Sequence, residues 1–276
     1  MQVSSTKYSG LVLAAKRPGI HDPLAQAAGV THKCMAPING RPMLERVIEA
    51  VLLSGRCKHV YVSIDDPQVL QSNKKIVGWL ADGSVSTVSA RSTLTDSVLA
   101  AAEQIPDRDW PVMITTGDNA LHTPEIVRDF IDGAESNGAD VSCGITREEV
   151  VVATLPEAAK AFHRLKDGGF SSCNLYSLKD RDALKAVEVF RGGGQFGKRH
   201  RRILKAFGLV SFLLYKLKLI TIDGMVRRVG KGFGVKVAAV FLPYDFGPID
   251  VDDQNSFDIS EKILKKREGI GARSQE

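Results

Sequence analysis

Short apolar runs alternate with segments of helical spacing along the first two-thirds of the chain. The runs have the length of single buried strands, and they cover residues 10–15, 59–64, 84–89, 110–115 and 140–145. Between them, apolar residues recur every three or four positions in residues 43–53, 68–80, 95–104 and 124–137, which is the spacing of one buried helix face. Because strands that alternate with helices are typical of parallel sheets with crossover helices, the pattern predicts a layered α/β domain.

The last third of the chain continues this pattern less regularly. Residues 170–177 and 235–242 have the composition of further strands, residues 181–190 have helical spacing, and residues 256–266 are amphipathic. No internal repeat or low-complexity linker interrupts the sequence. We therefore expect one domain over residues 1–276, in which residues at about 191–234 form a basic, apolar insertion.

Positive charge is concentrated in one region of the chain. The formal net charge is +5, yet residues 195–236 contain eleven Lys and Arg residues and one acid, Asp223. The remainder of the chain is therefore acidic overall. A regional excess of this kind does not predict that the fold as a whole binds nucleic acid.

The four cysteines are widely spaced, at positions 34, 57, 143 and 173. The absence of a C-x-x-C pair and of a histidine cluster beside them argues against a zinc site and against a disulfide framework, and it suits a reducing compartment. The apolar run near the N-terminus, LVLAA, is too short for the core of a signal peptide. We therefore expect a cytoplasmic location.

Small and polar residues follow two of the predicted strands at their carboxyl ends. Residues 14–17 (Ala-Ala-Lys-Arg) follow the first strand, and residues 117–118 (Gly-Asp) follow the strand at 110–115. Ligands of parallel α/β sheets bind beyond the carboxyl ends of the strands. The first loop can offer backbone N–H groups to phosphates, and Arg17 and Lys33 would add positive charge. The alternative is an ordinary surface loop with solvated cations.

The stretch from Leu11 to Leu44 resembles the beginning of the MobA-like NTP-transferase family, where a strand leads to Leu-Ala-(Ala/Gly)-Gly, an Arg, a Lys and Gly-x-Pro-(Met/Leu)-(Leu/Ile). The matching residues here are Leu13-Ala14-Ala15, Arg17, Lys33 and Gly40-Arg41-Pro42-Met43-Leu44. The resemblance implies a three-layer α/β/α, Rossmann-like fold of the glycosyltransferase A type with a mostly parallel sheet.

The same resemblance implies roles for individual residues. Leu13, Ala14, Ala15 and Lys16 would wrap the nucleotide, and Arg17 and Lys33 would be catalytic residues acting on its phosphates. Lys16 stands where the family usually has Gly, and the loop before Lys33 is longer than usual. The Lys16 side chain either blocks the close backbone approach that Gly allows or itself binds phosphate.

Residues 91–99 (RSTLTDSVL) resemble the segment of methylerythritol-phosphate-type cytidylyltransferases in which Asp-Ser-Val opens a helix beside the base. The resemblance implies that Ser97 contacts the nucleotide, and it favours CTP as the substrate, with GTP next. The alternative is that Asp96 and Ser97 only serve the start of a helix, with Asp96 as its N-cap.

Acidic residues suited to a metal ion occur at two places. Asp118 directly follows a predicted buried strand, and Asp250 and Asp252 form an Asp-x-Asp run that can present two carboxylates on one side. These places resemble the family's Gly-Asp-x-Pro-Leu motif, with Ala120 instead of the proline, and its late Asp-(Ile/Val)-Asp-Thr segment. The resemblance implies that Gly117 lies at the nucleotide and that Asp118 and Asp252, or less favourably Asp250, hold Mg²⁺. Solvated acidic turns are the alternative.

A basic and apolar segment covers residues 198–228. Its length approaches that of a membrane span, but the three lysines inside its apolar stretch would be costly in hydrocarbon. One interpretation is a peripheral helix on an anionic membrane, at the inner face of the cell membrane. The other is a subdomain helix that covers the sheet or a second copy of the chain in a homo-oligomer.

Together these features predict that a nucleoside monophosphate group moves from an NTP to an acceptor with a phosphate or phosphonate, releasing pyrophosphate. The acceptor would be a small molecule or a lipid-linked phosphate, in the latter case in a membrane-lipid or envelope pathway. The family's layout implies that residues 170–176, and Asn174 among them, lie near the acceptor. Catalysis would rest on positioning and electrostatics, with Mg²⁺ as the cofactor.

Two other functions remain open. A glycosyltransferase could use the Asp-Val-Asp run at 250–252 on a nucleotide-sugar, although the loop ending in Lys33 suits a pyrophosphate leaving group that sugar donors lack. A non-catalytic, membrane-associated nucleotide-binding protein is favoured by Lys16 and Ala120, where the chain departs from the family's pattern.

Overall fold

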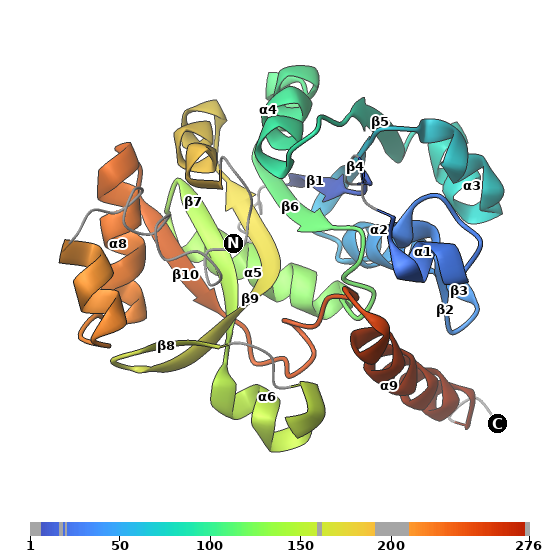
Figure 1. The fold of residues 1–276 in the computed structure, drawn as a ribbon. Coiled ribbons are helices and arrows are strands. Elements are labelled where there is room, and N and C mark those ends of the chain that lie inside the picture. The colour runs from blue at the N-terminus through green and yellow to red at the C-terminus, as the bar shows by residue number, and fades with distance from the viewer. Residues whose placement is uncertain (1–6, 17–18, 20, 159–161, 191–209, 274–276) are drawn as a thin grey trace, which may run out of the picture.

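The predicted strands come together in one sheet in the computed structural model, which describes residues 7–16, 19, 21–158, 162–190 and 210–273 (Figure 1). The strands of this sheet are β1 (Tyr8–Leu13), β4 (Cys57–Ile64), β5 (Val85–Ser89), β6 (Val112–Thr116), β7 (Val141–Arg147), β8 (His163–Leu165), β9 (Gly168–Leu178) and β10 (Val237–Phe241). Their order is β10-β7-β9-β6-β1-β4-β5, and β8 pairs with β9 off this path. A separate small hairpin joins β2 (Pro37–Ile38) to β3 (Arg41–Pro42).

The sheet is mostly parallel, as predicted. β1 pairs in parallel with β4 and β6, β4 with β5, and β7 with β10. Only β9 runs antiparallel within the path, between β6 and β7, and it also pairs antiparallel with β8. The carboxyl ends of β1 and β6 therefore lie next to each other, because their register pairs Leu13 with Thr116.

Helices cover both faces of this sheet. The helical elements are α1 (Pro23–Ala27), α2 (Met43–Leu53), α3 (Lys74–Ala81), α4 (Leu94–Gln104), α5 (Pro124–Asn137), α6 (Glu148–Thr154), α8 (Ile222–Phe233), α9 (Gln254–Arg273) and the shorter or tighter turns η1 (Lys33–Met35), η2 (Pro67–Ser72), η3 (Asp107–Asp109), η4 (Pro156–Ala158) and η5 (Arg181–Phe190). Neighbouring residues of β1 point to opposite sides: Val12 packs with α2 and α5, whereas Leu11 packs with α4 and η5. The predicted three-layer α/β/α fold is confirmed.

Two local predictions are wrong in an instructive way. Residues 68–80 are not one helix, because the Asn73 side chain accepts hydrogen bonds from Lys75 N and Ile76 N at 3.0 and 2.9 Å and starts α3 as its N-cap. The N-cap of α4 is Thr93 rather than Asp96: Asp96 N donates to Thr93 Oγ1 at 3.1 Å. Asp96 is thus a first-turn acid of α4.

The predicted basic insertion is described in part. Residues 191–209 of this predicted insertion lie outside the described residues, residues 210–216 are helical, and α8 follows a turn in which Lys218 has a φ of 54°. The long apolar stretch is therefore interrupted before Thr221, whose hydroxyl accepts from Gly224 N at 3.2 Å and caps α8. Within the described ranges, no helix has both the length and the apolar character needed to cross a membrane.

The last helix, α9, ties the C-terminal part of the chain to the centre of the fold. Arg46 Nη1 pairs with Glu268 Oε1 at 2.6 Å, and Arg267 Nη1 donates to Leu121 O at 2.9 Å. Arg267 also lies over the Phe246 ring, 3.9 Å from its centroid. These contacts hold the C-terminal half of α9 against α2 and against the segment that follows β6.

Candidate active site

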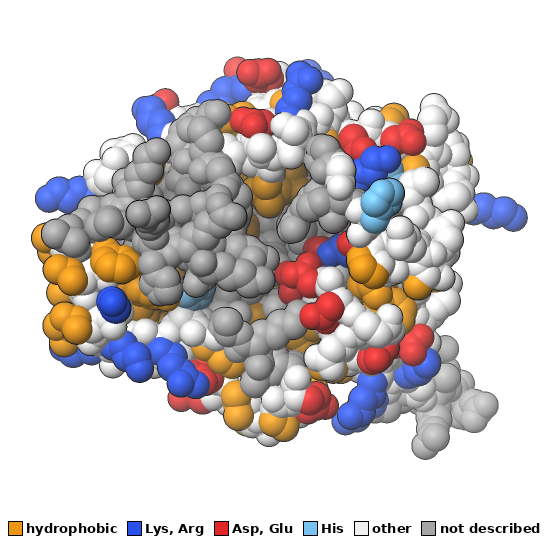
Figure 2. All heavy atoms as spheres, in the orientation of Figure 1, with side chains coloured by type: hydrophobic (Ala, Val, Ile, Leu, Met, Phe, Trp, Pro, Cys, Tyr) orange, Lys and Arg blue, Asp and Glu red, His pale blue; other side chains and the backbone are white. Residues whose placement is uncertain are grey.

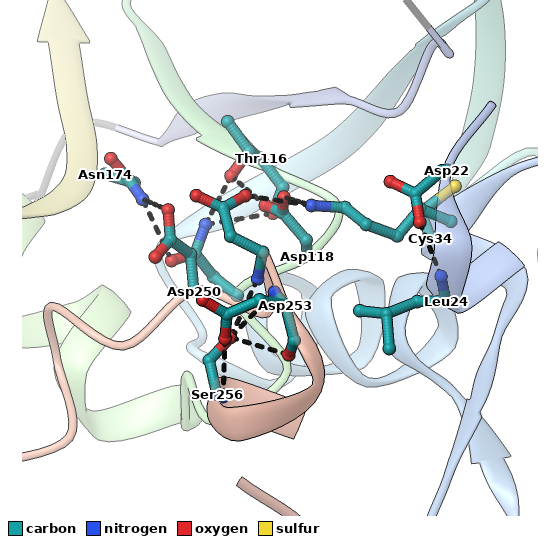
Figure 3. A network of polar contacts seen from close by, with 12 residues as sticks. Asp22, Leu24, Cys34, Thr116, Asp118, Asn174, Asp250, Asp253 and Ser256 are labelled. Carbon is teal, nitrogen blue, oxygen red and sulfur yellow. Dashed lines mark hydrogen bonds and ion pairs between the residues drawn. The ribbon is translucent and has the colours of Figure 1, made fainter. Parts of the chain in front are cut away.

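Three predicted site residues from distant parts of the chain meet beyond the carboxyl ends of β1 and β6. Lys33 Nζ lies 2.7 Å from Asp118 Oδ2 and 3.0 Å from Asp252 Oδ1. Lys33 opens η1, Asp118 follows β6, and Asp252 precedes α9. Figure 2 shows acidic side chains gathered near the centre of this face, and Figure 3 shows the contacts from close by.

The loop after β6 fixes the Asp118 carboxylate. Thr116 Oγ1 donates to Asp118 Oδ1 at 2.6 Å, so only part of the carboxylate remains for another partner. Val251 N donates to Asp118 O at 3.1 Å and binds the 250–252 segment to the same loop. A backbone contact thus carries Asp252 to the end of β6.

The turn before α9 holds Asp252 in place. The buried Ser256 hydroxyl accepts from Asp252 N and Asp253 N, each at 3.0 Å, and donates to Asp253 Oδ1 at 2.7 Å. Asp253 Oδ1 in turn accepts from Ser256 N at 2.8 Å, which is a helix N-cap arrangement. These bonds occupy the carboxylate of Asp253 (Figure 3), whereas the carboxylate of Asp252 is directed at Lys33.

The electrostatics of Lys33 follow from its two partners. Burial by itself would lower the pKa of the Lys33 ammonium, but the carboxylates of Asp118 and Asp252 outweigh burial, and the net shift of the pKa is upward. Its neighbour Cys34 donates from Sγ to Ala14 O at 3.3 Å, and burial raises the pKa of this thiol to about 12. Lys33 is therefore charged, and Cys34 acts as an apolar anchor for η1 rather than as a nucleophile.

Asn174 joins the same group from the antiparallel strand β9. Its Nδ2 donates to Asn119 Oδ1 at 3.3 Å and to Asp250 Oδ2 at 3.5 Å. Asn119 is fully buried and donates to Thr116 O at 3.3 Å. Asn174 has a φ of 51°, in the left-handed region, which turns its side chain toward these partners. Asn174, the residue predicted to bind the acceptor molecule, thus lies beside Asp250 in the group of acids that includes Asp118 and Asp252. Its contact with an acceptor stays a prediction.

The predicted nucleotide loop begins directly at the end of β1. Gly117 N donates to Leu13 O, and Ala14 N donates to Ser63 O, each at 2.9 Å. Ala15 follows without such a contact among those described, and Arg17 lies outside the described residues. Leu13, Ala14 and Gly117 are thus held at the sheet edge where the acids converge.

Asp65 and His32 hold this loop in place, although no sequence motif drew attention to them. Asp65 Oδ1 accepts from Lys16 N at 3.1 Å and lies 2.9 Å from His32 Nε2, while Thr31 Oγ1 lies 2.9 Å from His32 Nδ1. Burial would raise the pKa of Asp65, but these hydrogen bonds lower it on balance. Asp65 follows β4 at the same edge of the sheet, and this position was the signal in the sequence that could have indicated a site residue.

Gly117 has a packing reason to lack a side chain. A Cβ there would lie 3.1 Å from Cys34 Cβ and 3.3 Å from Leu44 Cδ1. The glycine therefore lets η1 and α2 approach the end of β6, which brings Lys33 to Asp118.

Ser97 lies inside α4 with its hydroxyl already bonded. It donates to Arg91 O at 3.0 Å and accepts from Arg91 N at 2.9 Å, and the residue is buried. In this arrangement Ser97 shapes the loop at residues 91–93. Direct contact with a nucleotide stays a prediction.

The donor set can be compared with the needs of a magnesium ion. Among the described residues, no three His, Cys, Asp or Glu side chains form a ready metal cluster. Mg²⁺ is commonly held by one or two carboxylates together with substrate phosphates and water. Asp118 and Asp252, which share one cation here, fit that pattern.

Comparison with known proteins identifies the family. A family model described as the MobA-like NTP transferase domain matches residues 14–203. The chain belongs to this family. The match begins at the loop after β1 and includes Lys33, Asp118 and Asn174, whereas Asp252 lies beyond it and reaches the site through the tertiary structure. The predicted family is confirmed.

Known proteins outside the family model are also similar to this member of the MobA-like NTP transferase domain family. The 8-amino-3,8-dideoxy-manno-octulosonate cytidylyltransferase of Shewanella sp. strain ANA-3 is 28% identical over 120 residues, which cover 43% of this chain and 47% of the relative. The match thus spans about half the length of this curated relative. A hypothetical transferase from Thermus thermophilus superposes with a TM-score of 0.73 and 25% identity over 91% of this chain and 100% of its own.

A more distant structure shares the fold. The 4-diphosphocytidyl-2C-methyl-D-erythritol synthase of Anaerococcus prevotii has a TM-score of 0.57 at 12% identity, over 95% of this chain and 99% of its own. At this identity the likeness concerns the fold alone.

Proposed function

We propose that this protein is a Mg²⁺-dependent nucleotidyltransferase that moves an NMP group from an NTP to a phosphate- or phosphonate-bearing acceptor. The convergence of Lys33, Asp118 and Asp252 at the carboxyl edge of the sheet carries the proposal. A cation and two carboxylates at the end of the predicted nucleotide loop, which begins after β1, suit the binding of a metal-bound triphosphate.

In the proposed reaction an acceptor oxygen attacks the α-phosphorus of the NTP, the bond to the bridging oxygen breaks, and pyrophosphate leaves with its electron pair. Asp118 and Asp252 would hold Mg²⁺, which supplies neutralisation of phosphate charge when bound. Lys33, freed from the two carboxylates, would stabilise negative charge on the transferring group, and we propose the same role for Arg17. Of the backbone N–H groups of residues 14–16, those of Ala14 and Lys16 already donate to Ser63 O and Asp65 Oδ1, so the N–H of Ala15 would be the one that orients the phosphates. No covalent enzyme intermediate is required.

CTP is the favoured substrate, with GTP next. The support is the cytidylyltransferase activity named for the Shewanella relative, together with the Asp96-Ser97-Val98 run at the start of α4. That relative's name specifies an octulosonate acceptor, a sugar acid, so a sugar acid is the second acceptor class to test.

Asn174 is the residue that we propose to bind the acceptor molecule. Its amide reaches both Asn119 and Asp250 from β9 (Figure 3). A donor in this place can bind an acceptor's oxygen while the carboxylates engage the metal.

Pyrophosphate release with each of the four NTPs, with and without Mg²⁺, tests the proposal. CTP should give the fastest release in the presence of an acceptor phosphate or sugar acid, and Asp118→Asn or Asp252→Asn should lower kcat by about 100-fold or more, as loss of a charge-stabilising group does. Asp82→Asn, an acid on the surface after α3, is the matched control and should retain activity.

Other outcomes separate the rival functions. Hydrolysis of nucleotide-sugars without pyrophosphate release from any NTP would favour a glycosyltransferase. Binding of an NTP without turnover under any of these conditions would favour a non-catalytic nucleotide-binding protein.

A lipid-linked acceptor at the inner face of the membrane, within a membrane-lipid or envelope pathway, is the finer part of the proposal. Its support is the apolar and basic character of residues 210–236. Assembly into a homo-oligomer stays a prediction that sedimentation velocity can test.

A further inference from the structure

Large apolar side chains gather at the surface at one end of the fold. Val210, Leu213, Leu217 and Leu219 are 62, 45, 63 and 58% exposed. The first three follow one another at helical positions i, i+3 and i+7, so they form a single stripe along the helix at 210–216 and its end. We call these four residues the leucine stripe.

The opposite side of the same segment is firmly packed. Leu214, Tyr215 and Ile220 belong to a cluster with Ile145 and Phe170 of the sheet. The stripe is therefore the outward face of an anchored segment, at the β10 edge of the sheet beside α8 (Figure 1). Such exposure of several leucines together marks an interaction surface rather than ordinary scatter.

Cations surround the stripe. Lys216 and Lys218 lie within it, and Arg227, Arg228 and Lys231 share the exposed face of α8, which packs into the same cluster through Ile222 and Met225. These five cations form no ion pair with any residue that the structure describes, and Asp223 is the only acid in residues 210–236. Figure 2 shows apolar and basic side chains side by side at this end of the molecule.

We propose that the leucine stripe and its five cations form a docking surface for an anionic lipid membrane. Leucines can enter the boundary between headgroups and acyl chains, while the cations remain at the phosphate level. The combination matches an anionic bilayer surface, which attracts clustered Lys and Arg within about a Debye length of 10 Å at 0.1 M salt.

Charge also decides against the other occupants. In a two-fold dimer the same patch would face itself, and each set of five cations would meet five more, which repels. Nucleic acid would engage the cations but leave the leucines in water. An anionic membrane satisfies both kinds of side chain at once.

The test uses the full chain with vesicles of phosphatidylcholine, alone or mixed with phosphatidylglycerol, in a flotation assay. The wild-type protein should bind the anionic vesicles at least about tenfold more tightly than the neutral ones, and high salt should weaken that binding. Leu213→Gln/Leu217→Gln/Leu219→Gln and, separately, Lys216→Gln/Lys218→Gln/Arg227→Gln/Arg228→Gln should each lose at least about tenfold in affinity.

Leu53→Gln is the matched control, because Leu53 is 64% exposed on α2, away from this surface. It should bind anionic vesicles like the wild type. Circular dichroism melting shows that each variant is folded, and pyrophosphate release reports on the reaction separately, so failure of the proposed function leaves this surface testable.

Two results would overturn the proposal. One is equal binding of the wild type to neutral and anionic vesicles, or wild-type affinity for anionic vesicles in both the leucine variant and the Lys/Arg variant. The other is a wild-type dimer in sedimentation velocity that the leucine variant converts to a monomer, which would make the stripe a contact between copies.

Discussion

Replacement of Lys33 by methionine probes how the candidate metal ligands are held before a metal arrives. Lys33 bridges Asp118 at 2.7 Å and Asp252 at 3.0 Å, so a divalent cation must displace the ammonium group to use both carboxylates. Methionine keeps most of the side-chain length and apolar volume but removes the charge. We therefore expect Lys33→Met to bind Mn²⁺, used in place of Mg²⁺, more tightly than the wild type in the absence of nucleotide.

The size of the effect follows from the two contacts. A hydrogen bond to a charged group contributes about 1.5–3 kcal/mol, and the Lys33–Asp118 pair, with both side chains 19% exposed, falls in that range. Asp252 is 41% exposed, so its pair is reduced by solvent to about 0.5–1 kcal/mol. A total of about 2–4 kcal/mol corresponds to roughly 30- to 700-fold in affinity, and relaxation of the freed lysine in water lowers the expected gain to about tenfold or more.

Electron paramagnetic resonance of free Mn²⁺ during titration measures this affinity directly. Lys58→Met is the matched control, because Lys58 pairs with Asp109 at 3.0 Å away from the site. Lys58→Met should leave the affinity for Mn²⁺ unchanged. The double variant Lys33→Met/Asp118→Asn should lose the gain in Mn²⁺ affinity that Lys33→Met shows. Mn²⁺ binding by Lys33→Met that is no tighter than in the wild type would refute the idea that the lysine and the metal compete. In either case Lys33→Met should fail to release pyrophosphate.

Three further predictions concern single residues. Asn174→Gly keeps the left-handed backbone, so it should melt like the wild type while raising KM for the acceptor. Asn174→Ala should raise KM as well and should also lose about 1–2 kcal/mol of stability. An unchanged KM in both variants would remove Asn174 from the acceptor site. Gly117→Ala should lower the free energy of unfolding by about 1–3 kcal/mol in urea, because its Cβ would press on Cys34 and Leu44, and an unchanged midpoint would contradict that packing. Burial lowers the pKa of His122 to about 4, so between pH 6.5 and 4 the unfolded chain binds a proton that the folded chain does not, and stability should fall by about 2–4 kcal/mol as the pH falls through this window. His122→Gln should flatten that slope in thermal melts at a series of pH values, and an identical slope in the variant would show that other groups cause it.

Several features were predictable because they depend on local sequence. The helices at 43–53 and 124–137 have the bounds that apolar spacing indicated, since each buries one face against the sheet. The boundary at Asn73 was missed because the apolar spacing continues through it, while a side-chain cap interrupts the helix. Capping chemistry, rather than hydrophobicity, set that limit.

The sequence by itself determined the layered fold, the family, and the separate motifs around Lys33, Asp118 and Asp252, because burial and strand endings leave a local pattern. Only the tertiary structure decided that these motifs form one site, in which Lys33 and Asp252 meet across 219 positions of the chain. The same is true of the His32–Asp65 pair that holds Lys16, and of β9, which lies antiparallel between β6 and β7. The physical reason is that periodicity reports whether a residue is buried, whereas contacts between distant segments depend on which strands pair and on the turns that join them.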